Sequence, residues 1–302
     1  MSRRSEEREN NSVKSEKLGK ANKKYYKENQ KMLKVTGLCK EYPSFSLKNV
    51  SFEVPDGCIT GFIGRNGAGK TTTLKSVMRT VIPSGGKVEI NGLDMRENET
   101  ELKKRISFTT GTFNYYKFKK LKTIASSYAG FYDDFDFNVF NSYAEKFELN
   151  LNKRVNELSA GMSVKFSLAL ALSHGAEIFI FDEPTSGLDP VAREEILDLF
   201  TEIVSDGKKS ILFSTHITED LEKCADYILY IRKGEIIFDK QKDELLDGHA
   251  LIKGGLDDLN EQLEQAAISI KTNSFGFSGL IERSALELLR EENLLSANIV
   301  TE

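Results

Sequence analysis

A glycine-rich segment at residues 64–71 limits the fold of this chain more than any other feature. It reads Gly64-Arg65-Asn66-Gly67-Ala68-Gly69-Lys70-Thr71 and fits the pattern G-x-x-x-x-G-K-[ST]. The apolar stretch Cys58–Ile63 precedes it and a helical pattern follows it, which is the strand–loop–helix order of a phosphate-binding loop. Glycines let backbone N–H groups surround a phosphate, and the helix points its positive end at the anion. We therefore predict that Lys70 reaches the β- and γ-phosphates of a nucleotide and that Thr71 binds Mg²⁺.

An acidic pair supplies the second half of such a site. Asp182 and Glu183 directly follow the apolar run Ile178–Phe181, which we predict to be a buried strand. Ligands of open α/β sheets bind at the carboxyl ends of the strands. Taken alone, the pair fits a strand capped by solvated acids equally well. Beside a phosphate loop, it indicates that Asp182 holds Mg²⁺ through water and that Glu183 polarises the attacking water.

The charge is unevenly distributed along the chain. The net charge is −4, yet residues 1–34 carry 11 Lys and Arg against 5 Asp and Glu. Residues 1–31 lack apolar periodicity, which predicts a basic disordered arm. The acidic remainder disfavours a uniformly basic nucleic-acid-binding protein.

Several protein classes are excluded by the same composition. No apolar run approaches the ~20 residues that span a bilayer, and the polar start of the chain is not a secretory signal. Cys39, Cys58 and Cys224 are scattered, so they form neither a disulfide framework nor a metal cluster. We expect a reducing cytoplasm.

The pattern after the arm predicts three regions. Residues 32–247 form the main domain, because strands alternate with helices from Glu177 onward and indicate a mostly parallel sheet covered by helices. Residues 248–302 are acidic and weakly patterned, which indicates a small C-terminal subdomain. Within the main domain, residues 113–175 are predicted to form a helical subdomain with an aromatic core. That core is drawn from aromatic residues spaced mostly by three or four: Tyr128, Phe131, Tyr132, Phe135, Phe137, Phe140, Tyr143 and Phe147.

Three further motifs narrow the family. Leu158-Ser159-Ala160-Gly161-Met162 precedes the acidic strand, Ser186-Gly187-Leu188-Asp189-Pro190 follows it, and Ser214-Thr215-His216 ends the next strand. In this order they resemble the signature motif, D-loop and switch histidine of the ATP-binding-cassette (ABC) ATPases, over about residues 33–240. The resemblance implies an α/β fold: a P-loop (RecA-like) ATPase core with an antiparallel β subdomain, an inserted helical subdomain and a small C-terminal appendage.

The resemblance also implies the cofactors, ATP and Mg²⁺, and the role of each site residue. Two copies of such a chain enclose two ATP molecules, and the signature loop of each copy caps the γ-phosphate held by the other. His216 would sense the γ-phosphate and Asp189 would organise the dimer seam. Tyr42 stands where the family stacks an aromatic ring on adenine, although surface packing accounts for a lone Tyr nearly as well. The expected catalytic residues are Lys70, Glu183 and His216, the metal ligands Thr71 and Asp182, and the nucleotide contacts Tyr42, Gly64, Arg65, Asn66, Gly67, Ala68, Gly69, Lys70, Thr71, Thr72, Ser159, Gly161 and Asp189.

The sequence departs from the family pattern at two places. Ala160 and Met162 replace Gly and Gln of the usual signature, but the expected γ-phosphate donors remain. Gly111 stands where the family has a Gln that contacts Mg²⁺ and the membrane subunit. We hypothesise slow basal turnover and altered coupling to the partner.

The resemblance implies a peripheral subunit of a transporter. It predicts a homodimer at the cytoplasmic face of the cell membrane that drives a separate integral membrane permease. The segment Asn114–Lys120 would meet that permease or, as the alternative, form only a solvated helix face. The most similar branch is the small-exporter ATPases of Gram-positive bacteria that serve antimicrobial-peptide resistance or export phenol-soluble modulins, so we expect an exporter of peptides or antimicrobial compounds. A drug, a lipid or an ion fits as substrate equally well. The basic arm would bind an anionic membrane surface or serve only as a solubilising tail. The alternative function is a soluble ABC-type ATPase acting on nucleic acid or the ribosome, although nucleic acid is disfavoured as a partner.

Overall fold

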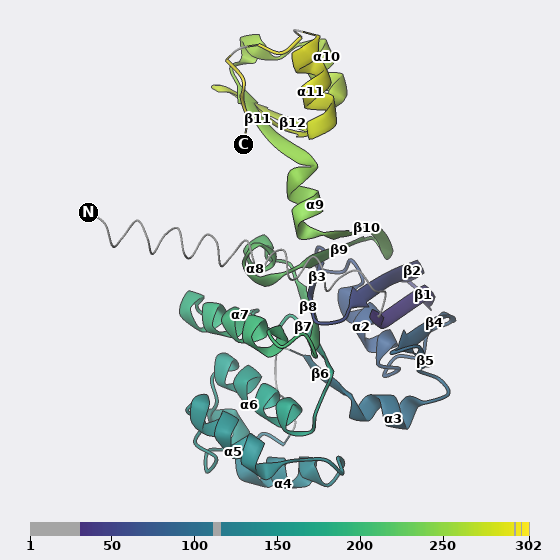
Figure 1. The fold of residues 1–302 in the computed structure, drawn as a ribbon, viewed down its shortest axis with the longest axis vertical. Coiled ribbons are helices and arrows are strands. Elements are labelled where there is room, and N and C mark those ends of the chain that lie inside the picture. Colours follow the sequence, from purple (N-terminus) through teal and green to yellow (C-terminus); the bar gives the residue numbers. More distant parts are fainter. Residues whose placement is uncertain (1–30, 111–115, 293, 297, 302) are drawn as a thin grey trace, which may run out of the picture.

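The computed structural model describes residues 31–110, 116–292, 294–296 and 298–301. Figure 1 shows a central sheet with an antiparallel sheet at one side and a group of helices at the other. A third sheet lies at the end of the molecule opposite helices α4 and α5.

The central sheet brings the predicted motifs to one edge. Its order is β10-β9-β3-β8-β7-β6, parallel from β9 to β6, with β10 antiparallel at the edge. Ile63 pairs with Thr215, and Asp182 pairs with Ser214, so the loops that follow β3, β7 and β8 start side by side. The strands are β3 (Ile59–Ile63), β6 (Ile106–Thr110), β7 (Ile178–Asp182), β8 (Ser210–Thr215), β9 (Tyr227–Arg232) and β10 (Glu235–Gln241).

The two faces of the central sheet have separate cores. Ile178 and Ile180 of β7 pack with the antiparallel sheet and α2, whereas Phe179 and Phe181 pack with α5 to α8. A strand buried on both faces reads as a continuous apolar run, which explains the sequence of β7. The elements of the first face are β1 (Lys31–Tyr42), β2 (Phe45–Pro55), β4 (Gly85–Ile90), β5 (Leu93–Asp94), α2 (Lys70–Val77) and α3 (Glu99–Lys104), with sheet order β2-β1-β4-β5.

The helices on the second face agree with the expected fold class, but fewer of the listed aromatic residues are buried than their spacing predicted. The expected core is only partly present: Phe140 and Phe147 are buried, whereas Phe131 is 75% exposed and Phe137 is 46% exposed. The reason is a helix break, because Asp136 caps a new helix by accepting hydrogen bonds from Asn138 and Val139 and so resets the helical phase. The elements are α4 (Leu121–Ala129), α5 (Phe137–Lys146), the 3₁₀ turn η1 (Val155–Glu157), α6 (Ala160–Ser173), α7 (Pro190–Val204) and α8 (Thr218–Cys224). Within the described ranges, no helix has the length and apolar character needed to cross a membrane.

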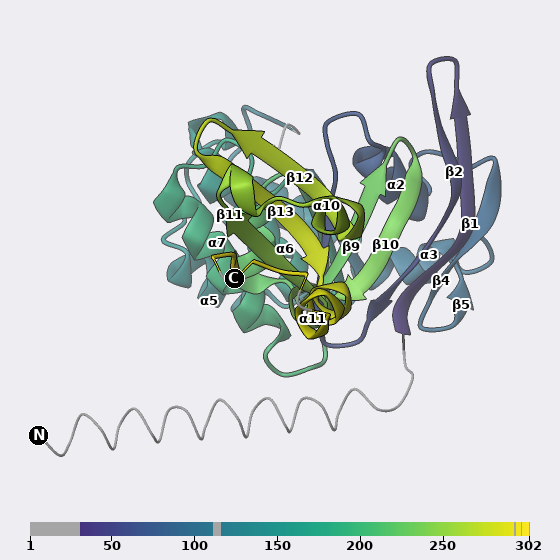
Figure 2. The ribbon, with the colours of Figure 1, turned by 90° about the horizontal axis from the view of Figure 1, so that it is seen from above.

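The third sheet forms with its own core near the C-terminus. Its order is β12-β13-β11-β14, and Ile252, Leu263, Phe277 and Ile281 pack inside it. Helix α9 leads to it from β10 (Figure 1), and every residue of α9 is exposed or half-buried. Figure 2 shows α10 and α11 beside the strands of this sheet. The elements are α9 (Lys242–Asp247), β11 (His249–Gly254), η2 (Leu256–Asp258), α10 (Glu261–Ala266), β12 (Ala267–Asn273), β13 (Gly276–Glu282), α11 (Arg283–Glu291) and β14 (Val300–Thr301).

A buried histidine makes the stability of the helical region sensitive to pH. His174 follows α6, is 4% exposed and stacks on Tyr132 with ring centroids 4.0 Å apart. Its Nδ1 lies 3.2 Å from the carbonyl oxygen of Lys104. Burial lowers the pKa of His174 from 6.5 to about 4, so below pH 6.5 the unfolded chain takes up a proton that the folded chain does not.

We therefore expect the His174 contribution to stability to fall as the pH drops from 6.5 toward 4. The wild-type chain should lose about 2 kcal/mol from this group between pH 7.5 and pH 5. The variant His174→Phe, which can still stack on Tyr132, should show a smaller loss of stability over that range. Urea unfolding at both pH values measures the difference, and an equal loss in the two proteins would contradict the prediction.

Candidate nucleotide-binding site

The phosphate loop connects β3 to α2 and requires glycine at two of its positions. A Cβ on Gly64 would lie 2.6 Å from the carbonyl oxygen of Ile231. Gly69 has φ +119°, and its Cβ would lie 2.8 Å from Leu47 Cδ2. Arg65, Asn66 and Gly67 are exposed at the tip of the loop, Ala68 is buried, Thr71 is exposed and Thr72 is half-buried. The backbone of the loop is thus held close to its neighbours while its tip and Thr71 stay accessible.

Lys70 lies inside the loop. Its side chain is 6% exposed, and Nζ is 2.6 Å from the carbonyl oxygen of Gly64 and 3.0 Å from Glu183 Oε1. Since Gly64 opens the loop and Lys70 closes it, the first contact folds the loop back on itself. The second contact aims the ammonium group at the acid that follows β7.

The acidic pair is held by the next strand. Ser214 Oγ donates to Asp182 Oδ1 over 2.7 Å and accepts from the backbone N–H of Glu183 over 2.9 Å. Asp182 is 7% exposed. Glu183 has φ +55°, a left-handed conformation that is costly for a side chain other than glycine. This backbone turn separates the two acids, with Asp182 in the sheet and Glu183 at the mouth of the loop.

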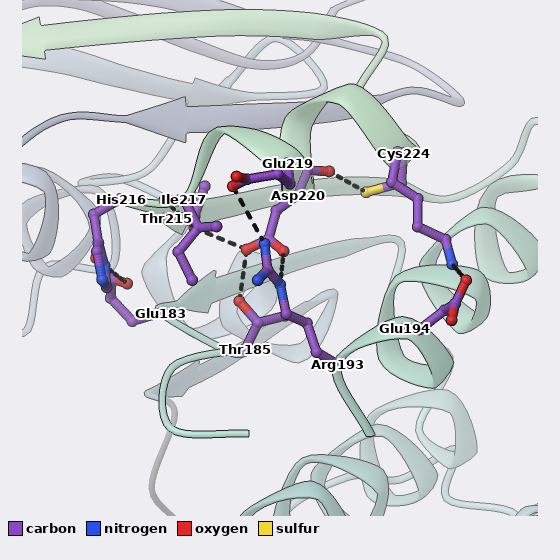
Figure 3. Close-up of polar contacts among 11 residues, drawn as sticks. Glu183, Thr185, Arg193, Glu194, Thr215, His216, Ile217, Glu219, Asp220 and Cys224 are labelled. Carbon is purple, nitrogen blue, oxygen red and sulfur yellow. Dashed lines mark hydrogen bonds and ion pairs between the residues drawn. The ribbon is translucent and has the colours of Figure 1, made fainter. Parts of the chain in front are cut away.

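His216 completes the cluster of polar side chains. Its Nδ1 lies 2.7 Å from Glu183 Oε2, and Figure 3 shows the two side chains facing each other. Glu183 therefore contacts Lys70 with one carboxylate oxygen and His216 with the other. The three expected catalytic residues come from three separate loops and meet at one point.

Thr71 and Asp182 suit Mg²⁺, which prefers hydroxyl, carboxylate, water and phosphate oxygens. In the part of the chain that the structure describes, no group of three His, Cys, Asp or Glu residues could hold a metal ion. A metal ion here would consequently need the phosphate oxygens of a nucleotide, which is the usual manner of Mg²⁺ binding in phosphoryl-transfer sites.

The remaining expected nucleotide contacts lie elsewhere on the chain. Ser159 caps α6 and is exposed, with Oγ accepting from the Met162 N–H over 3.2 Å. Gly161 is packed against the first turn of α7, because a Cβ there would lie 3.4 Å from Ala192 Cβ. Asp189 caps α7 by accepting from Val191 and Ala192. These three residues gather around the N-termini of α6 and α7.

Tyr42 ends β1 on the antiparallel sheet. It is 42% exposed, and Lys40 Nζ lies 5.5 Å from the centroid of its ring. Gly111, residues 114–115 of the expected permease contact and residues 1–30 of the basic arm lie outside the described residues. From residue 116 that contact segment is described, and Tyr116 and Phe118 are 72% and 74% exposed.

Gly234 makes contacts at the site that the sequence does not predict, because Lys233-Gly234 indicates only a turn. Gly234, at the tip of the β9–β10 hairpin, donates its N–H to Ala68 of the phosphate loop over 2.9 Å. Its carbonyl oxygen accepts from the N–H of Lys48 in β2 over 2.8 Å. A Cβ on Gly234 would lie 1.9 Å from the carbonyl oxygen of Ser46, so only glycine fits. Lys233-Gly234 predicted the hairpin, but not its bonds to two other elements.

A parallel sheet with a phosphate loop and an acid pair at its carboxyl edge defines a P-loop nucleotide hydrolase. The family model described as "ABC transporter" matches residues 47–186. The chain is 31% identical over 220 residues to the bacitracin transport ATP-binding protein BcrA of Bacillus licheniformis, covering 71% of each chain. It is 30% identical over 215 residues to the lantibiotic transport ATP-binding protein SrtF of Streptococcus pyogenes, covering 70% of this chain and 92% of that protein. The chain belongs to the family of ABC transporter ATP-binding proteins.

Solved structures agree with this assignment. An ATP-binding subunit of an ABC transporter superposes with a TM-score of 0.64 at 26% identity, covering 71% of this chain and 91% of that one. An ATP-binding cassette dimer in a post-hydrolysis state with ADP and Pi shares the fold, with a TM-score of 0.61 at 23% identity over 70% of this chain and 98% of that one. The expected family, fold class and function are confirmed: the chain is an ATP-hydrolysing subunit of an ABC transporter.

Proposed function

We propose that ATP binds with its phosphates in the loop 64–71 and that Glu183 positions the water for hydrolysis. The contact of Glu183 with both Lys70 and His216 carries this proposal, because it places a carboxylate, an imidazole and an ammonium group together at the mouth of the loop. Mg²⁺ would be held by Thr71 and, through water, by Asp182. It would neutralise charge on the phosphates, while Lys70 and the loop backbone orient them. Tyr42 would stack on adenine.

A second copy of the chain is the partner that fits the remaining residues. Ser159, Gly161 and Asp189 surround the N-termini of α6 and α7, where helix ends attract anions. We propose that these ends cap the γ-phosphate held by the other copy in a homodimer. The domain division follows from this assignment, with residues 32–247 as the ATPase domain and residues 248–302 as a C-terminal subdomain.

The other partner is an integral membrane permease. The two relatives named above are called bacitracin and lantibiotic transport proteins, and we propose that this chain likewise drives export of peptide antimicrobials from the cytoplasmic face of the membrane. Tyr116 and Phe118 support a docking surface, since one large exposed ring directly precedes the basic run Lys117–Lys120 and the other lies within it. The basic arm, residues 1–31, would add attraction to anionic lipid at about 1 kcal/mol for each Lys or Arg near the membrane surface.

The docking surface can be tested with a matched pair of variants. Co-expressed with its permease, the tagged chain should co-purify with an integral membrane protein from detergent-solubilised membranes. Tyr116→Ser with Phe118→Ser should reduce the yield of that partner at least tenfold, because large aromatic side chains often carry most of the binding energy of an interface.

The control is Phe131→Ser, which removes a ring that is 75% exposed in the same helical region. It should leave the yield unchanged. Equal yields from the double variant and the wild-type chain would reject the docking surface, and absence of any membrane protein would reject the permease as a partner.

A further inference from the structure

A fully buried carboxylate lies behind the catalytic cluster. Asp220, in the first turn of α8, is 0% exposed. Its Oδ2 accepts from Thr185 Oγ1 over 2.7 Å and from Thr215 Oγ1 over 2.9 Å. Its Oδ1 accepts from Arg193 Nε, as Figure 3 shows. Three hydrogen bonds and one cation thus compensate for the burial of this charge.

Each partner of Asp220 lies within four residues of a residue of the site. Thr215 directly precedes His216, and its Oγ1 also accepts from the Ile217 N–H over 3.0 Å, which fixes the turn that carries the histidine. Thr185 follows Glu183 by two residues in the loop after β7. The third partner, Arg193, connects to the N-terminus of α7, because its backbone N–H donates to the carbonyl oxygen of Asp189 over 3.0 Å. Asp220 therefore joins the loop after β7, the loop after β8 and the start of α7.

The direct contact between Glu183 and His216 needs such support. The side chain of His216 is 43% exposed and that of Glu183 is 23% exposed. Pairs so open to water contribute little to holding two loops together. The hydrogen bonds at Asp220 are shielded from water by comparison. Removing one of its partners there leaves the buried carboxylate short of a hydrogen bond, which is costly. The rigid element of this arrangement is thus the buried network and not the pair at the mouth of the loop.

We propose that Asp220 is a positioning residue for ATP hydrolysis. It holds the loops after β7 and β8 in a fixed position relative to each other, so that His216 faces Glu183. It also fixes the N-terminus of α7 relative to both loops. The proposal rests on the proposed roles of Glu183 and His216. It assigns a function to a residue that belongs neither to the phosphate loop nor to the acid pair.

The test removes one hydroxyl and keeps the shape of the side chain. Thr215→Val should lower the maximal rate of ATP hydrolysis about tenfold, while the KM for ATP changes less than twofold because the phosphate loop is untouched. Thr215→Ser keeps the hydroxyl and should retain most of the wild-type rate. Thr60→Val is the control, since Thr60 is equally buried in β3 and its Oγ1 has no hydrogen-bond partner among the described residues. Equal rates in Thr215→Val and Thr60→Val would overturn the proposal.

Hydrogen exchange gives a readout that does not depend on ATP. The Ile217 amide should be protected in the wild-type chain and in Thr215→Ser, and should exchange faster in Thr215→Val and in Asp220→Asn. Unchanged exchange in Asp220→Asn would show that Asp220 does not fix the histidine turn. Faster exchange with an unchanged rate of hydrolysis would also overturn the positioning role and would leave the proposed function intact. ATP hydrolysis that persists in Glu183→Gln would instead contradict the proposed function.

Discussion

Replacing Glu183 by Gln is expected to stop ATP turnover without preventing ATP binding. The amide keeps the size of the side chain and a hydrogen bond to His216, but it cannot accept a proton from the attacking water. Loss of a general base costs on the order of 10²–10⁴ in rate. With hydrolysis blocked and both ATP-binding surfaces intact, the chain should accumulate as an ATP-bound dimer. Phosphate release measures the rate, and size-exclusion chromatography with light scattering in ATP and Mg²⁺ measures the dimer.

The matched control for this experiment is Glu202→Gln on α7. Glu202 is an exposed acid paired with Lys146, far from the phosphate loop in sequence. It should retain the wild-type rate and remain monomeric after ATP is consumed. If Glu183→Gln stays monomeric in ATP and Mg²⁺, the proposed ATP-closed homodimer is wrong.

Replacing Lys70 by Ala is expected to abolish ATP turnover by a different route. The buried Lys70 ammonium contacts both Gly64 of the phosphate loop and Glu183. Its removal takes the cation from the phosphates and leaves Glu183 without its charge partner. We expect a loss of at least a hundredfold in turnover together with weaker ATP binding, in contrast to Glu183→Gln, which should still bind ATP.

Lys103→Ala serves as the control, because Lys103 forms an exposed ion pair with Glu99 within α3. Binding of a fluorescent ATP analogue distinguishes Lys70→Ala from Glu183→Gln, and phosphate release compares the hydrolysis rates of all the variants. A wild-type rate in Lys70→Ala would refute the assignment of residues 64–71 as the phosphate loop.

The charged groups of the site could be predicted from sequence because their positions depend on strand ends. Residues 64–71, Asp182 and His216 each follow a short apolar run, and parallel strands end at the same edge of a sheet. Local sequence therefore determined the neighbourhood of these side chains. The contact of Glu183 with Lys70 and His216 agrees with that expectation in the structure.

The errors and omissions come from tertiary contacts. The aromatic spacing from Tyr128 to Phe147 looks continuous, but α4 ends at Ala129 and a new helix begins after the cap at Asp136, which leaves Phe131 between the two helices and exposed. Asp220 had no sequence signal, because its partners Thr185 and Arg193 lie 35 and 27 residues away along the chain. The third sheet was missed because its apolar residues are few and are shared between short strands and helices.

The hairpin tip at Gly234 bears on the entropy of nucleotide binding. Its two hydrogen bonds connect the phosphate loop to β2, which pairs with the strand that ends at Tyr42. The surfaces proposed for adenine and for the phosphates are consequently connected by backbone hydrogen bonds before the nucleotide arrives. Ordering two separate surfaces around a ligand would consume part of the binding free energy. Because this hairpin orders the two surfaces during folding, more of the interaction energy with the nucleotide would be available for the proposed closure of two copies of the chain around it.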